Sequence, residues 1–246
     1  MVYTEEFPPY NFTVNGEISG INIRLVKAAC EEAKIECLFE MYPWNRAMRM
    51  ALSGPNTGIV STARTEERET QFSWVGPLKS SQNCIYKLAS RNDVTIPNLK
   101  AASNYVMGAS TDSAYRNVLK TLGFEVGKNL KIYREKYGSA RPFAAQRVDL
   151  IVGSANSIEL QLAAGGLTLK DVVPVAKIDN SHFKGNYLAL HPAIDAEVVD
   201  KLQSSLDRLV SSGAAKEIEL EFTKPISLNS AEMVNPALWD DCMRAE

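Results

Sequence analysis

A short run of hydroxyl and guanidinium side chains lies between a predicted strand and a predicted helix. Gly58–Ser61 is a brief apolar run bounded by turn residues, which indicates a buried strand. Thr65 is a common residue type at a helix N-cap, and the two acids after it suit the positive end of a helix. The donors in this region are Ser61, Thr62, Arg64, Thr65 and Arg68. Hydroxyls and an arginine fork beside a helix start favour the binding of an anion such as a carboxylate.

Arg68 has a second interpretation, in which it is a surface helix residue. It would then pair with Glu66 or Glu67, and an exposed ion pair of that kind adds little to stability. The residue types alone leave both interpretations open.

Aromatic side chains occur at two further places where predicted strands end. Val2–Thr4 predicts a first strand, and the loop after it carries Phe7 and Tyr10 around two prolines. Trp44 stands between a strand that ends at Pro43 and a helix that begins there. Aromatic rings on a loop at a strand end are candidates to line a pocket, whereas a tryptophan at such a junction can also fill the core.

The composition of the chain argues against several classes of protein. Its 246 residues carry a formal net charge of −2. The sequence has no basic stripe for nucleic acid, no basic amphipathic segment for a membrane surface, and no apolar run long enough to span a bilayer. With two histidines and no CxxC motif, neither a zinc site nor a Cys/His catalytic pair is supported.

Strands and helices alternate along most of the chain. Residues 35–41 alternate with a period of two, which predicts a strand, and residues 21–34 have the apolar spacing of an amphipathic helix. Further strands are predicted at 84–88, 105–109, 130–133, 149–153, 172–175 and 186–190, and further helices at 44–52, 114–122, 140–146, 157–164 and 194–209. This order predicts a mostly parallel α/β sheet with helices on both faces.

Four segments of the sequence resemble the bacterial extracellular solute-binding proteins of the polar amino-acid family, family 3. They read FPPYNF, YPWNRA, TGIVSTARTEER and FSWVGPL. The resemblance implies an α/β fold of the periplasmic-binding-protein-like type II, with two lobes and a hinge of two crossing strands. By this resemblance, residues 1–88 and 184–246 form lobe 1, which includes the tail 223–246, and residues 89–183 form lobe 2.

The resemblance also implies a binding site for a small solute. Arg68 matches the arginine that grips the α-carboxylate of the ligand, and Ser110 and Thr111 match a Gly-Thr-Thr turn of the second lobe. Neither a cofactor, nor a metal, nor a catalytic residue is expected. The expected ligand-binding residues are Glu5, Phe7, Tyr10, Trp44, Ser61, Thr62, Arg68, Ser110, Thr111 and Ser154.

Ser154 departs from the pattern of the family. It stands where amino-acid binders usually place an aspartate that pairs with the ammonium group of the ligand. A neutral hydroxyl does not offset the desolvation of a buried ammonium as a carboxylate does. Either Glu159, Glu5 or Glu6 takes over that role, or the solute is an organic acid or another polar metabolite without a primary amine.

The four cysteines bear on the compartment. By resemblance to histidine- and lysine/arginine/ornithine-binding members of the family, Cys30 and Cys37 are expected to form a disulfide, which implies an oxidising compartment. The alternative is two buried free thiols. Cys84 and Cys242 either form a second bridge that fixes the C-terminal tail or do not, since connectivity does not follow from sequence.

These expectations together indicate a periplasmic substrate-binding component of an ABC importer. The protein would be a monomer from which the signal peptide has been removed. It would close two lobes over a carboxylate-bearing polar solute and deliver this solute to the membrane permease. Met1 is followed by no signal peptide, so a cytosolic protein has the same appearance. The alternatives are the extracellular sensing domain of a signalling receptor and, ranked below it, a cyclohexadienyl-dehydratase-like enzyme. Turnover is not expected, because acids such as Glu5 and Glu159 serve binding equally well.

Overall fold

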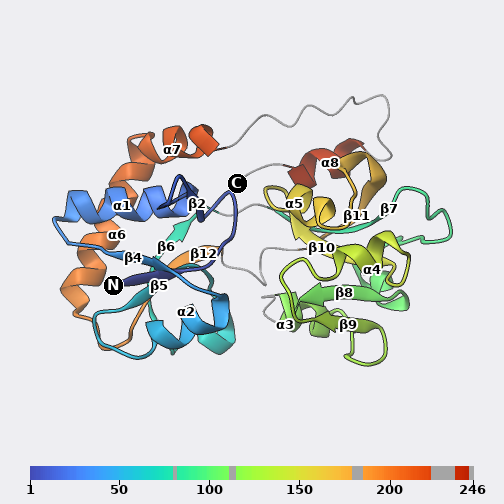
Figure 1. Cartoon of the computed structure of the whole chain (residues 1–246), viewed down its shortest axis with the longest axis horizontal. Helices are drawn as coiled ribbons and strands as arrows, with labels where there is room; N and C mark the ends of the chain where they lie inside the picture. Colours follow the sequence, from blue (N-terminus) through green and yellow to red (C-terminus); the bar gives the residue numbers. More distant parts are fainter. Residues whose placement is uncertain (80–81, 111–114, 179–184, 223–235, 244–246) are drawn as a thin grey trace. The chain divides into compact units, whose positions relative to one another are not determined.

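The chain divides into two compact units. The computed structural model describes residues 1–79, 82–110, 115–178, 185–222 and 236–243 (Figure 1). Unit 1 comprises Met1–Ser80 and Phe183–Pro225, and unit 2 comprises Ser81–His182 and Ile226–Glu246. The chain therefore passes from unit 1 to unit 2 twice, after Ser80 and after Pro225, and returns to unit 1 once in between.

Unit 1 is built on a five-stranded mixed sheet with the order β4-β1-β5-β12-β6. β4, β1 and β5 are parallel, and β12 is antiparallel to both β5 and β6. The strands of this sheet are β1 (Val2–Thr4), β4 (Phe39–Met41), β5 (Gly58–Ala63), β6 (Ser73–Leu78) and β12 (Asn186–Leu190), and a separate hairpin pairs β2 (Phe12–Val14) with β3 (Glu17–Ser19). The helices are α1 (Ile21–Ala33), α2 (Trp44–Ala51), α6 (Ala196–Ser211) and α7 (Ala214–Phe222), with one 3₁₀ turn, η1 (Glu66–Arg68).

The core of unit 1 follows from the alternation of side chains along its strands. On β5, Ile59 belongs to one apolar cluster with Ala47 of α2, whereas Val60 belongs to another with Leu25 of α1 and Leu202 of α6. Successive side chains of a strand point to opposite faces, so one short strand contributes to both clusters. Helices α1 and α6 therefore serve one apolar cluster and α2 the other.

Unit 2 repeats this plan with the strand order β11-β7-β10-β8-β9. β9, β8 and β10 are parallel, and β7 is antiparallel to β10 and β11. Its strands are β7 (Asn83–Leu88), β8 (Met107–Ser110), β9 (Leu130–Tyr133), β10 (Leu150–Ser154) and β11 (Val172–Ile178). Its helices are α3 (Tyr115–Thr121), α4 (Ala140–Ala144), α5 (Ile158–Ala163) and α8 (Pro236–Met243), with the 3₁₀ segments η2 (Leu99–Asn104) and η3 (Leu169–Asp171).

The α/β class and the order of most elements agree with the sequence. Each sheet is mostly parallel, as predicted, but contains one antiparallel strand. In each unit the antiparallel strand lies second from one edge of the sheet, and it is the first strand that the chain forms after it enters the unit: β7 in unit 2 and β12 on its return to unit 1. A strand reached from another unit does not need a helical crossover, which is what enforces parallel pairing.

Two boundaries differ from those predicted. Residues 84–88 were predicted to end lobe 1, yet they form β7, which pairs with β10 and β11 of unit 2. The shift in composition after residue 88 therefore marks a loop within unit 2. The tail was predicted with lobe 1, but α8 belongs to unit 2, because Trp239 packs beside Tyr86 with ring centroids 6.3 Å apart and Cys242 is covalently bound there.

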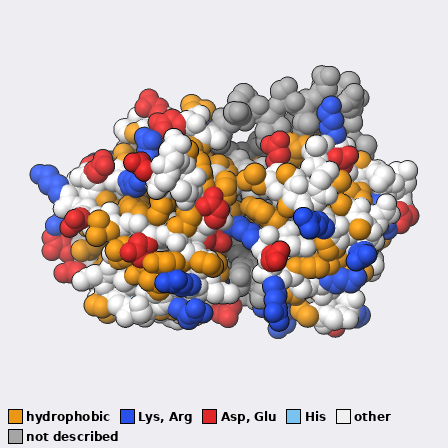
Figure 2. Space-filling model, in the orientation of Figure 1, with side chains coloured by type: hydrophobic (Ala, Val, Ile, Leu, Met, Phe, Trp, Pro, Cys, Tyr) orange, Lys and Arg blue, Asp and Glu red, His pale blue; other side chains and the backbone are white. Residues whose placement is uncertain are grey.

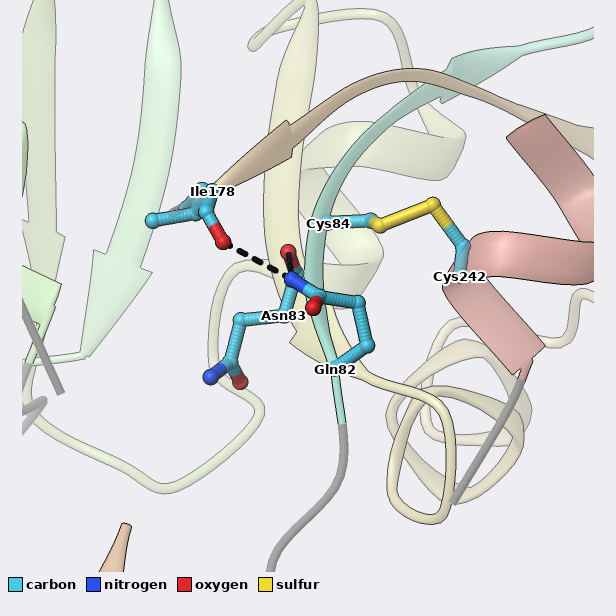
Figure 3. The surroundings of a disulfide bond; sticks show 5 residues. All are labelled: Gln82, Asn83, Cys84, Ile178 and Cys242. Carbon is cyan, nitrogen blue, oxygen red and sulfur yellow. Dashed lines mark hydrogen bonds between the residues drawn. A yellow bond between two sulfur atoms is a disulfide. The ribbon is translucent and has the colours of Figure 1, made fainter. Parts of the chain in front are cut away.

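Two disulfide bonds join all four cysteines. Cys30 at the end of α1 is bonded to Cys37 before β4, with a Cα–Cα distance of 6.2 Å, which confirms the expected bridge. Cys84 of β7 is bonded to Cys242 of α8, with a Cα–Cα distance of 5.9 Å (Figure 3). No cysteine is free, so the interpretation of Cys30 and Cys37 as buried thiols is wrong, and the open alternative for Cys84 and Cys242 is decided in favour of a bridge.

On the face drawn in Figure 2, basic and acidic side chains are interspersed. Within the described residues, no helix combines the length and the apolar character needed to cross a bilayer.

Removal of the long-range bridge by Cys84→Ala/Cys242→Ala is expected to lower the free energy of unfolding by about 2–5 kcal/mol, because it frees a long loop of the unfolded chain. Cys30→Ala/Cys37→Ala is the matched comparison, since its cysteines lie 7 residues apart instead of 158. The shorter loop is expected to cost less. Urea denaturation measures both, and an equal or larger loss for the 30–37 pair would contradict this ranking.

Candidate functional site

β5 carries a bulge near its end, in its pairing with β12. The register between β5 and β12 shifts between Tyr187 and Ala189, and Ser61 on the opposing strand has a φ of 60°. A residue other than glycine is uncommon in this left-handed region. Bulges and unusual backbone conformations of this kind occur frequently next to functional sites, where they re-aim side chains.

The hydroxyls of Ser61 and Thr62 are engaged within unit 1. The Ser61 hydroxyl donates to Oδ1 of Asn11 and accepts from Nδ2 of Asn22 at 2.9 Å. Thr62 is 0% exposed, and its hydroxyl donates to the carbonyl of Ile59 at 3.3 Å. Both residues lie at the predicted place, but these bonds hold the end of the strand in position, so direct contact of either hydroxyl with a solute stays a prediction.

The segment after β5 does not form the predicted α-helix. Glu66–Arg68 is a single 3₁₀ turn, and the Thr65 side chain accepts no capping hydrogen bond. One turn with three residues provides neither the dipole nor the row of free N–H groups that an α-helix start offers to an anion. The predicted contribution of a helix start is therefore missing, and the group that this turn offers to an anion is the guanidinium of Arg68.

Arg68 lies half-buried, and its guanidinium makes a single hydrogen bond to the described part of the chain. Its Nη1 donates to the carbonyl of Ala63 at 3.3 Å, and its Cζ lies 5.5 Å from the centre of the Trp44 ring. Burial lowers the pKa of Arg68 from its usual value, while the nearby charge of Glu67 opposes this shift. Among the described residues, no carboxylate forms an ion pair with Arg68, which argues against its interpretation as a paired surface residue.

Arg64 in the same loop has the opposite environment. Its Nε donates to both carboxylate oxygens of Glu69, at 2.9 and 3.2 Å, and its Nη2 donates to Oε1. Its Cζ also lies 5.3 Å from the centre of the Tyr187 ring and 5.5 Å from that of Trp74. The hydrogen bonds that Arg64 donates to Glu69 raise the pKa of Arg64. Of the two arginines, Arg64 is already paired with a carboxylate of the chain, whereas Arg68 forms no ion pair with a described carboxylate and can bind one from a solute.

Trp44 is the aromatic residue that the structure brings to Arg68. It is the first residue of α2 and lies half-buried at the margin of the apolar cluster that holds Ile59. Tyr10 is instead 1% exposed and belongs to the core beside α1, so its contact with a solute stays a prediction. Its ring centroid is 5.0 Å from that of Phe7, which is half-buried against the same core.

The predicted acid of the first loop, Glu5, is half-buried. Its carbonyl accepts from Nδ2 of Asn11 at 2.6 Å. This bond joins the loop after β1 to the same asparagine that receives the Ser61 hydroxyl. The loop is therefore held next to the bulge by its backbone.

In unit 2, two predicted residues end neighbouring parallel strands. Ser110 ends β8 and Ser154 ends β10, so both stand at the edge of the sheet where ligands of open α/β sheets commonly bind. The Ser154 hydroxyl lies 2.7 Å from that of Ser157 and is buried. Glu159, the suggested substitute acid, is exposed on α5. Thr111 falls outside the described residues.

Asn22 is the functional candidate that the sequence did not reveal. It is completely buried, and its Nδ2 donates to Ser61 Oγ at 2.9 Å and to the carbonyl of Lys79 at 3.1 Å. Its Oδ1 accepts from the backbone N–H of Lys79 at 3.0 Å. The available signal was an asparagine between two isoleucines at the apolar start of α1, where a polar side chain needs buried partners.

Lys79 also forms an ion pair with a buried acid in α7. Its Nζ lies 3.1 Å from Oε2 of Glu219, which also receives Lys216 at 2.8 Å. Glu219 is 1% exposed. Burial opposes its charge, but the hydrogen bonds from Lys216 and Lys79 outweigh that effect and hold its pKa below the ordinary value.

The geometry suits a binding site more clearly than a catalytic one. The candidate site of unit 1 consists of one half-buried cation that forms no ion pair with a described residue, an aromatic ring beside it, and buried polar groups that fix the backbone behind it. Among the described residues, no group of three acidic, cysteine or histidine side chains is arranged to hold a metal ion. This arrangement can bind an anionic group through charge-assisted hydrogen bonds of fixed geometry.

Two α/β units with this strand order define the periplasmic-binding-protein-like class. The chain belongs to the bacterial extracellular solute-binding proteins, family 3, whose family model matches residues 1–225. No curated protein matches it.

Several solved structures share the fold. A histidine kinase sensor domain described as similar to periplasmic binding proteins matches with a TM-score of 0.74 and 21% identity, over 90% of this chain and 95% of that one. An ancestral arginine-binding protein bound to arginine matches with a TM-score of 0.72 and 19% identity, over 91% of this chain and 97% of that one. A third match is ArtJ, the arginine-, lysine-, histidine-binding protein of the thermophilic bacterium Geobacillus stearothermophilus. Its TM-score is 0.69 and its sequence identity 15%, over 94% of this chain and 98% of that one. At these identities, the similarity establishes the fold.

Substitution of the buried acid, Glu219→Gln, is expected to lower the free energy of unfolding by about 1–3 kcal/mol at pH 7, because two lysines lose their shared carboxylate. Since the folded-state pKa of Glu219 is lowered, its stabilisation is present above the ordinary pKa of about 4.3 and is lost as the pH falls through the folded value. The difference between wild type and variant should therefore shrink below about pH 4.

The matched control is Glu221→Gln on the same helix. Glu221 pairs with Arg24 at 3.1 Å, with both side chains about half exposed, so its loss should cost less than about 1 kcal/mol. Denaturation curves between pH 3 and pH 8 measure both variants. Equal costs for the two substitutions, or a cost for Glu219→Gln that grows as the pH falls, would contradict the assignment.

Proposed function

We propose that this protein is the periplasmic substrate-binding component of an ABC importer, which captures a small polar solute by its carboxylate. The observation that carries the proposal is the state of Arg68, a half-buried cation whose only hydrogen bond among the described residues goes to the carbonyl of Ala63. The neighbouring Arg64, by contrast, donates hydrogen bonds to a carboxylate of the chain itself, that of Glu69.

The recognition step follows from the chemistry of the guanidinium. Its planar fork matches a carboxylate with two parallel hydrogen bonds, and the Trp44 ring beside it provides an apolar wall. Because burial has already removed part of the water around Arg68, an incoming carboxylate replaces solvation that the cation lacks. In this proposal Ser61 and Thr62 hold the end of β5 in position, and Glu5 and Phe7 flank it.

The class of solute is an amino acid or a related carboxylate. Membership of the family and the names of the similar structures support an amino acid. The buried hydroxyl pair of Ser154 and Ser157 offers no charge to an ammonium group, which supports a related carboxylate as well. We include Ser110 and Thr111 of unit 2 as further ligand contacts, together with closure of the two lobes over the solute.

The remaining parts of the proposal concern place and partners. Two disulfide bonds, of which one ties the last helix to unit 2, are typical of an oxidising compartment and support the periplasm. The protein would bind its solute without turnover, act as a monomer and pass the solute to a membrane permease.

A second candidate function is the extracellular sensing module of a signalling receptor. The histidine kinase sensor domain matches this chain over 95% of its own length with a TM-score of 0.74. The same carboxylate site would then control an output domain. The gene decides between the two functions: a neighbouring permease and ATPase support import, and an encoded membrane span with a kinase domain supports sensing.

A solute that binds only the native protein is expected to raise the melting temperature of the wild type by about 5–10 °C at a hundredfold excess over its dissociation constant. The panel for this thermal-shift measurement comprises amino acids, organic acids, polyamines and small peptides. Arg68→Ala should abolish the shift for the carboxylate that binds the wild type. Arg68→Lys should retain only part of it, because lysine keeps the charge but loses the fork.

Arg49→Ala is the matched control, because Arg49 is an exposed arginine in the last turn of α2. It should leave the shift intact. A shift that persists unchanged in Arg68→Ala would show that the carboxylate binds elsewhere, and a panel in which only amines without a carboxylate stabilise the wild type would overturn the proposed solute class.

A further inference from the structure

The carbonyl and amide of Lys79 form a point of convergence within unit 1. Asn22 donates to the Lys79 carbonyl at 3.1 Å and accepts from the Lys79 N–H at 3.0 Å. Asn186 donates to the same carbonyl at 3.2 Å. Glu219 holds the ammonium group of the same residue at 3.1 Å. Three side chains from three elements therefore fix one residue that follows the end of β6.

Lys79 lies next to the point where the chain first leaves unit 1. Unit 1 ends at Ser80 and resumes at Phe183, so Lys79 immediately precedes the first passage to unit 2 and Asn186 closely follows the return. The two passages are thus tied to each other in unit 1 by the bond from Asn186. In unit 2, Nε2 of Gln82 ties the corresponding ends by donating to the Ile178 carbonyl at 2.7 Å (Figure 3).

Asn22 also reaches the candidate site. The same Nδ2 that donates to Lys79 donates to the Ser61 hydroxyl at 2.9 Å, and Ser61 is the left-handed residue of the bulge that precedes Arg68. A carboxamide that uses both of its ends in buried bonds has little freedom to turn without losing one of them. Displacement of Ser61 is therefore expected to weaken the hydrogen bonds between Asn22 and the backbone of Lys79.

We propose that Asn22 is a positioning residue that couples the end of β5, and with it the candidate solute site, to the first passage of the chain between the two units. The role in solute capture rests on the proposed function, whereas the coupling itself is a property of unit 1. Through Asn22, occupation of the site changes the anchoring of Lys79, and the anchoring of Lys79 changes the site, because coupling free energies are reciprocal.

Amide hydrogen exchange of the solute-free protein, followed by NMR, tests the coupling at the N–H of Lys79. In Asn22→Ala this amide loses its acceptor and should exchange about tenfold faster or more, relative to amides of β1 that report global opening. Ser61→Ala alone should accelerate the same amide about threefold or more, although Ser61 makes no bond to Lys79. These accelerations fall in the range of measured coupling between neighbours.

A double-mutant cycle separates coupling from general loosening of unit 1. In the Asn22→Ala background, Ser61→Ala should produce no further acceleration at Lys79. In the Asn186→Ala background, which removes the other amide donor to Lys79, Ser61→Ala should keep its full effect. Non-additivity confined to the pair with Asn22 is a result that a merely stabilising asparagine does not produce.

Gln203→Ala is the matched control. Gln203 accepts from the N–H of Gly76 on β6 at 2.8 Å, so its loss should accelerate Gly76 and leave Lys79 unchanged. The proposal is overturned if Ser61→Ala leaves Lys79 exchange unchanged in the wild type, or if its effect is equal with and without Asn22. The comparison of Ser61→Ala with Gln203→Ala decides the point even if Asn22→Ala does not fold. Because no solute is present, a failure of the Arg68 assignment does not alter this outcome.

Discussion

The buried hydrogen bonds around the Ser61 hydroxyl are the interaction on which the candidate site depends. They hold a residue other than glycine in the left-handed region at the end of β5, a conformation that persists only where its surroundings enforce it. After the bulge, Thr62 and Ala63 still pair with β12, and the loop that follows β5 places Arg68 beside Trp44.

Around this point, unit 1 balances charge in three different ways. Arg64 is neutralised by Glu69, and Lys79 and Lys216 share the buried Glu219. Arg68 alone of these cations is half-buried with no carboxylate from the described chain. Since buried charges are normally paired, that exception is the physical reason to assign a ligand to this arginine.

The sequence foretold much of the fold because local patterns decide it. Strand alternation and helix spacing depend on neighbouring residues, so the order of elements in both units agrees with expectation. The end of lobe 1 was misplaced because the assignment of β7 to a sheet depends on pairing with β10 and β11, which are distant in sequence. The family resemblance supplied Cys30–Cys37, whereas the pairing of Cys84 with Cys242 required the structure.

The candidate site was only partly predictable for a similar reason. Residue type and resemblance predicted Arg68 and Trp44 as ligand contacts, and the structure places these two side chains beside each other. Tyr10 is buried in the core, so its contact with a solute stays a prediction. The helix expected after Thr65 is one 3₁₀ turn. Asn22 escaped notice because its role lies entirely in tertiary contacts with Ser61 and Lys79.

The most direct measurement is a crystal structure of the protein with the solute that gives the largest thermal stabilisation. The expected result is a carboxylate of the solute bound by two hydrogen bonds of about 2.7–2.9 Å from the Arg68 guanidinium, beside the Trp44 ring. A solute bound elsewhere, with Arg68 still bonded only to the carbonyl of Ala63, would contradict the assignment of the site.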